Sequence, residues 1–107
     1  MNRLEARLAE LAALGQTISY GDLARELAIP GPGAIAKLTA ALEALMEIDT
    51  SQGRPLRAAS CMGRLADGLP AQGFFDKAAA LGRYDGSDPA LWVAVERARL
   101  FSIPPAG

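Results

Sequence analysis

Three observations predict a mainly α-helical fold with a small β-hairpin, organised as a winged helix-turn-helix with additional C-terminal helices. The sequence is 50% hydrophobic, and alanine and leucine supply most of that content, as in cores built from packed helices. Apolar residues recur at intervals of three and four along several segments. A proline- and glycine-containing segment, residues 29–33, separates two of these segments. At 107 residues the chain suits one domain, residues 1–107.

The first predicted helix carries a leucine stripe near the N-terminus. Its members are Leu4, Leu8, Leu11 and Leu14, which share one face of a helix. Gly15 follows, and a helix end commonly needs a left-handed residue that glycine adopts without steric cost. The first helix should therefore end there.

Two further helices are predicted around a tight turn. Thr17-Ile18 is long enough for one β-bridge, and the four residues 19–22, Ser-Tyr-Gly-Asp, match a capping box with Asp in place of Glu. A helix should begin at Tyr20 and end by Ile29, because the residue before Pro30 disfavours helical dihedrals. A third helix should run to about Glu47, with its apolar positions at Ile35, Leu38, Leu42 and Leu45. Two helices joined in this way form a helix-turn-helix.

The helical period fails after Ile48. Ser51-Gln52-Gly53 has the composition of a turn between two extended stretches, residues 47–50 and 56–62, and this predicts a β-hairpin that would form the wing. Residues 63–73 contain three glycines and Pro70 without a period, so we expect a loop.

Two helices are expected in the C-terminal third. The first follows Gly73-Phe74-Phe75, and the second begins at Asp88-Pro89, an N-cap followed by proline at the first helical position. The second should turn a set of apolar residues toward the core: Leu91, Trp92, Val95, Ala98 and Phe101. The aromatic residues Trp92, Phe74 and Phe75 are expected to fill the core.

Charge and hydropathy limit the partners. The net charge is −1 and the pI about 5.3, which argues against tight sequence-independent nucleic-acid binding. Residues 50–83 are locally basic, with five basic and two acidic residues. No apolar run approaches the roughly 20 residues of a membrane span, and the charged N-terminus lacks a secretory pattern. We therefore expect a cytoplasmic protein without a membrane partner, and the lone Cys61 agrees with a reducing compartment.

The residue types needed for common catalysis are scarce. The chain has no histidine and one cysteine, which removes Ser/His/Asp triads and structural zinc sites. Gly31-Pro32-Gly33 lacks the third glycine of a dinucleotide fingerprint, since Ala36 stands there. We expect no enzyme, no catalytic residue, no cofactor and no metal. Cys61 is the only candidate nucleophile, and its alternative role is that of a small buried hydrophobe.

Residues 17–24, Thr-Ile-Ser-Tyr-Gly-Asp-Leu-Ala, resemble the opening of the winged-helix DNA-binding region of the alkylguanine DNA alkyltransferases and alkyltransferase-like proteins. The order of Gly53-Arg54-Pro55-Leu56 and of the later Gly68 and Gly73-Phe74 is similar to that family's active-site strand and loop. The family's reactive Pro-Cys-His-Arg is absent, because residues 60–63 read Ser-Cys-Met-Gly. Its base-flipping arginine is replaced by Ala36 or Lys37. The resemblance therefore implies a fold and DNA contact, but neither alkyl transfer nor base flipping.

Residues 73–78, followed by Leu81-Gly82, also resemble a stretch found in small bacterial winged-helix proteins. This second resemblance implies no activity.

Two function hypotheses follow. In the first, the third helix enters the major groove of double-stranded DNA while Arg54 and Arg57 on the wing reach phosphates. The residues expected at this interface are Ser19, Tyr20, Ala34, Lys37, Arg54, Arg57 and Arg64. In the second, the Ala-rich outer face of the third helix packs against a protein partner or a second copy, because only one cation, Lys37, and no Arg, Asn or Gln stands on that face. A small-molecule or enzymatic role for residues 63–73 is a third reading.

Overall fold

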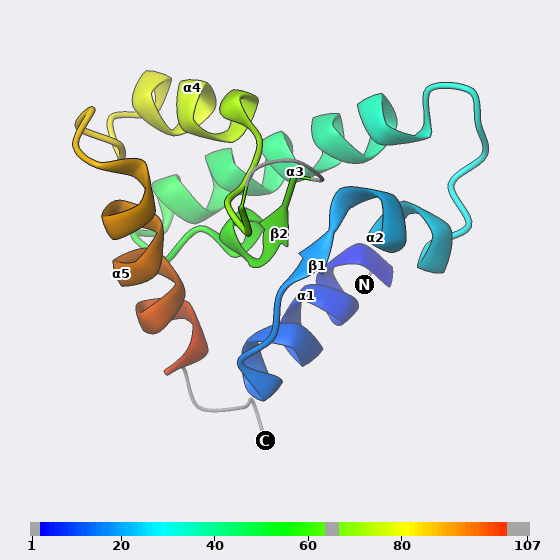
Figure 1. Ribbon diagram of the computed structural model, residues 1–107, viewed down its shortest axis with the longest axis horizontal. Coiled ribbons are helices and arrows are strands. Elements are labelled where there is room, and N and C mark those ends of the chain that lie inside the picture. Colours follow the sequence, from blue (N-terminus) through cyan, green and yellow to red (C-terminus); the bar gives the residue numbers. More distant parts are fainter. Residues whose placement is uncertain (1–2, 64–66, 103–107) are drawn as a thin grey trace.

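The computed structural model describes residues 3–63 and 67–102, which contain five α-helices and a two-stranded sheet (Figure 1). The elements in order are α1 (Arg3–Leu14), β1 (Ile18–Ser19), α2 (Tyr20–Glu26), α3 (Ala34–Ser51), the 3-10 helix η1 (Arg57–Ser60), β2 (Cys61–Met62), α4 (Gln72–Ala80) and α5 (Pro89–Phe101). The mainly helical fold class is confirmed. In these ranges no helix combines the length and apolar character needed to cross a bilayer.

The predicted start and stop signals position the first two helices. Gly15 adopts a φ of 65° after α1, and the N–H of Gln16 donates to the carbonyl of Leu11 at 2.9 Å. Ser19 caps α2, because its Oγ accepts the N–H of Asp22 at 3.1 Å. Ala28 then takes a left-handed φ of 55°, which lets the chain leave α2 ahead of Pro30. The two helices expected on either side of the proline- and glycine-containing segment are therefore present as α2 and α3, with residues 27–33 between them.

The predicted β-hairpin is wrong. Its first strand, residues 47–50, is the last turn of α3, and residues 57–60 form η1 rather than a strand. The two strands that do form are parallel, with Ile18 opposite Cys61 and Ser19 opposite Met62. The described residues therefore contain no hairpin wing, although the short strand expected at Thr17-Ile18 forms one residue later as β1.

A buried aspartate explains the error. Asp49 is fully buried, so the apolar period ends at a position that still faces the interior. Its carboxylate accepts the backbone N–H of Arg57 at 2.9 Å and pairs with the guanidinium groups of Arg54 and Arg57. These bonds attach the end of α3 to the segment that follows it, and the local pattern gives no sign of them.

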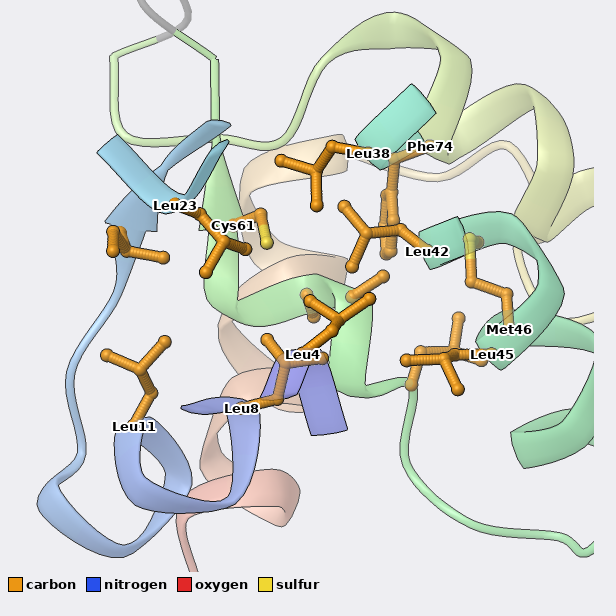
Figure 2. Packing of buried hydrophobic residues seen from close by; sticks show 14 of the residues in the cluster. Leu4, Leu8, Leu11, Leu23, Leu38, Leu42, Leu45, Met46, Cys61 and Phe74 are labelled. Carbon is orange, nitrogen blue, oxygen red and sulfur yellow. The ribbon is translucent and has the colours of Figure 1, made fainter. Parts of the chain in front are cut away.

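One core joins all the helices. Leucines from α1, α2 and α3 meet Cys61 of β2 and Phe74 of α4, as Figure 2 shows. The short helix η1 packs against α1, α3 and α5, and its Ala58 and Ala59 are buried. This packing leaves the opposite face of α3 open.

The orientation predicted for α5 is partly wrong. Leu91 and Val95 are 68% and 61% exposed, whereas Val93, Glu96 and Leu100 form the buried face. The sequence misleads because a carboxylate, Glu96, occupies a core position. The aromatic residues do pack inward: Phe74 and Phe75 are buried, and Trp92 packs against the core.

Candidate nucleic-acid interface

The exposed face of α3 consists almost entirely of small side chains. Leu38, Leu42 and Leu45 turn into the core. The α3 residues that remain exposed are Ile35, Ala36, Lys37, Ala40, Ala41, Ala44, Glu47, Ile48 and Ser51. We call six of these, Ala36, Lys37, Ala40, Ala41, Ala44 and Ile48, the α3 outer face; Glu47 beside them forms an ion pair with Lys77 of α4. By the helical rise α3 is roughly 27 Å long. It can therefore approach a flat or grooved partner closely along its length.

A groove adjoins the N-terminal end of this face. It encloses about 630 Å³ and is lined by Ser19, Tyr20, Gly21, Asp22, Arg25 and Ile35. Arg25 forms an ion pair with Asp22, so the groove carries little net charge. Its lining comes from the start of α2 and from Ile35 of α3, so the groove adjoins the α3 outer face.

Tyr20 connects the start of α2 to the segment before α4. Its hydroxyl oxygen accepts the N–H of Ala71 at 3.1 Å. Burial raises the pKa of the Tyr20 phenol to about 12, so it stays neutral.

Cys61 is held as a buried structural residue. Its side chain is fully enclosed, and burial raises the pKa of its thiol to about 12 despite the nearby Arg97. Arg97 instead donates to the carbonyls of Ala59 at 2.7 Å and Cys61 at 3.3 Å. Because the thiolate is the nucleophilic form, this geometry supports the structural interpretation of Cys61.

The predicted interface residues fall into two groups. Ser19, Tyr20, Ala34 and Lys37 lie at the N-terminal ends of α2 and α3. Ser19 serves as the α2 cap, Ala34 packs partly against the core, and Lys37 is exposed with its Nζ 3.4 Å from the carbonyl oxygen of Pro30.

Arg54 and Arg57 lie beyond the other end of α3. The Arg57 side chain is only 21% exposed and binds Asp49 at 3.0 Å, while Arg54 binds the same carboxylate at 3.1 Å. The two arginines therefore neutralise the buried carboxylate of Asp49, and they do not extend from a wing as the sequence predicts. Arg64 lies outside the described residues.

Sequence reasoning missed one feature near Tyr20. A small hollow of about 40 Å³ lies between α3 and α4, where Thr39 and Glu43 meet Phe74. Thr39 is half-buried there. No local signal could indicate it, because α4 closes the hollow from a distant part of the chain.

Among residues 3–63 and 67–102, no three His, Cys, Asp or Glu side chains gather in a group that could hold a metal ion. Comparisons with protein-family models, with curated proteins and with solved structures gave no match.

Proposed function

We propose that the protein binds double-stranded DNA without sequence specificity, placing the α3 outer face in a groove of the duplex. The observation that carries the proposal is that α3, the helix that follows α2, has one face exposed along its length, and that this face adjoins the open groove beside α2. A helix in this position is the usual DNA-contacting element of a helix-turn-helix motif. The resemblance of residues 17–24 to alkyltransferase DNA-binding regions agrees with this choice.

The side chains available define the kind of binding. Bidentate readout of base edges needs Arg, Asn or Gln, and the α3 outer face has none. Alanine side chains allow the helix backbone to approach the duplex, and Lys37 supplies a phosphate contact. Gly33 gives α3 no side-chain cap, so the first-turn N–H groups are open to a phosphate oxygen. We therefore expect weak, sequence-independent binding through few phosphates.

Fluorescence anisotropy of a labelled random duplex, titrated with protein at several KCl concentrations, tests this proposal. We expect a Kd between about 1 and 100 µM and a log–log salt slope near −1 to −2, because each phosphate contact contributes about −0.9. Ala40→Glu should weaken binding at least tenfold, because it places a negative charge on the α3 outer face. Lys37→Ala should reduce the slope by about one contact.

Ala9→Glu is the matched control, since Ala9 is exposed on α1 and receives the same change. It should bind like the unaltered protein apart from the small effect of net charge. Absence of binding at 20 mM KCl, or equal loss in Ala40→Glu and Ala9→Glu, would contradict the proposal.

Docking of a protein partner is the second candidate, favoured by the low charge of the same face, where Lys37 is the one charged residue. Ile48 is 41% exposed at one end of α3, and Ile35 is exposed beside the groove at the other. Small residues between two apolar ones suit close helix packing. An interaction of this kind would survive high salt and be lost in Ile48→Glu, whereas DNA binding depends strongly on salt.

A further inference from the structure

Helix α5 exposes an apolar strip that the DNA proposal does not use. Leu91 and Val95 are 68% and 61% exposed, and Ala94 and Ala98 beside them are also exposed. The spacing of these four residues puts them on one face of the helix. We call this set the α5 strip.

Charges of opposite sign stand at the two ends of the strip. Asp88 is the N-cap of α5, and Arg99 lies in its last turn with 52% of its side chain exposed. No charged residue interrupts the face between them, because Glu96 is buried and Arg97 turns inward to the carbonyls of Ala59 and Cys61. The strip therefore runs from an acid through an apolar centre to a base.

This order is complementary to itself in one orientation. When two copies of α5 pack antiparallel, Asp88 of each meets Arg99 of the other, and Leu91 of each meets Val95 of the other. A parallel pairing places like charges together. Ala94 and Ala98 permit close approach of the helices. A patch that fits its own copy about a two-fold axis is the pattern of an isologous dimer.

Both charged groups keep capacity for a second copy. Asp88 uses Oδ1 to accept the N–H groups of Ala90 and Leu91, which leaves Oδ2 for a partner. Nη1 of Arg99 lies 3.3 Å from Oε1 of Glu96, and the other guanidinium N–H groups of Arg99 can donate to a partner.

We propose that a second copy of this chain docks antiparallel on the α5 strip and forms a weak two-fold dimer. One helix face is smaller than the roughly 800 Å² per partner of a stable interface, so we expect a dissociation constant of about 10 to 500 µM. In Figure 1, α5 and α2 lie at opposite ends of the molecule, so this dimer leaves both α2–α3 faces open.

Sedimentation equilibrium of the full chain from 5 µM to 1 mM tests the proposal. The unaltered protein should show a monomer–dimer equilibrium that weakens in 0.5 M NaCl. Val95→Glu should raise the dissociation constant at least tenfold, and its circular dichroism should match that of the unaltered protein because Val95 is exposed.

Two controls make the same change on other exposed apolar residues: Leu14→Glu on α1 and Ile48→Glu on α3. Both should dimerise normally. A monomer at 1 mM, an unaffected Val95→Glu variant, or dissociation by Ile48→Glu instead would overturn the α5 dimer. Because DNA binding uses α3, Val95→Glu should still bind a duplex, so the two proposals fail independently.

Discussion

Cys61 shows how far a single residue type can be interpreted from sequence. A lone cysteine between two arginines in the chain, Arg57 and Arg64, allowed either an activated thiolate or a buried apolar residue. The structure buries the thiol completely and holds Arg97 on backbone carbonyls instead. Burial therefore dominates, and it raises the pKa of the Cys61 thiol.

This shift predicts a loss of stability at alkaline pH. In the unfolded chain the thiol ionises near its ordinary pKa of 9.0, whereas in the folded protein it stays neutral until about pH 12. The contribution of Cys61 is complete below pH 9 and declines as the pH rises toward 12. We expect it to lower the free energy of unfolding by about 2 kcal/mol between pH 8 and 10.5.

Urea unfolding of the unaltered protein and of Cys61→Ala at both pH values measures this contribution. The free energy of unfolding of the variant should fall less as the pH rises. The fall that remains is due to Tyr20, whose pKa is also raised to about 12. Equal losses in the two proteins would contradict the assignment to Cys61.

At the scale of the element, helix ends were predictable where their signals are local. Gly15, the Ser19 cap, Pro30 and the Asp88-Pro89 pair each act on backbone groups within a few residues. Accordingly, α1 ends at Leu14, α2 begins at Tyr20 and ends at Glu26, ahead of Pro30, and α5 begins at Pro89. The end of α3 and the orientation of α5 were not predictable, because buried carboxylates occupy core-facing positions there. The partners that make Asp49 and Glu96 tolerable lie outside their own helices, apart from Arg99.

Asp49 offers a test of this explanation. In Asp49→Ala the guanidinium of Arg57, which is mostly buried, loses its partner, and the Arg57 N–H loses its acceptor. We expect the free energy of unfolding to fall by about 3 to 5 kcal/mol, measured by urea denaturation. Asp49→Asn should fall between this variant and the unaltered protein.

Asp76→Ala is the control, because Asp76 is an exposed α4 acid whose partner is Gln72. It should change stability by less than about 0.5 kcal/mol. If Asp49→Ala were no less stable than Asp76→Ala, the buried pairing would not hold the end of α3.

At the scale of the whole molecule, Glu96 ties together three parts of the chain. Its Oε2 accepts the N–H of Leu56 at 2.8 Å and a guanidinium N–H of Arg83 at 2.9 Å. Arg83 also donates to the carbonyl of Arg54 at 2.9 Å. The segment after α3, the segment after α4 and helix α5 thus share one carboxylate.

Glu96→Gln should therefore destabilise the whole fold and not only the surroundings of residue 96. The amide cannot accept from both donors with full charge, and we expect a loss of about 1.5 to 3 kcal/mol. Hydrogen exchange at Leu56 should speed up by the same factor as the slowest core amides. Glu47→Gln, which alters an exposed pair with Lys77, should leave exchange at Leu56 unchanged.

In the candidate site, too, some residues follow from local sequence signals, and others depend on contacts between distant parts of the chain. Short motifs predicted the start of α2 at Ser19 and Tyr20, and helical periodicity predicted that Lys37 lies on α3. The reassignment of Arg54 and Arg57 to Asp49, and the parallel pairing of β1 with β2, depend on contacts across the fold. Sequence periodicity cannot reveal such contacts, because it reports only which face of a helix or strand is apolar.

The position of α1 has a consequence for synthesis of the protein. Its buried leucines are covered by η1 and α5, so the elements that enclose the first helix are encoded in the second half of the chain. A nascent polypeptide that has left the ribosome only as far as α3 still exposes that leucine stripe to water and to chaperones. Productive folding must therefore wait until translation has passed α5.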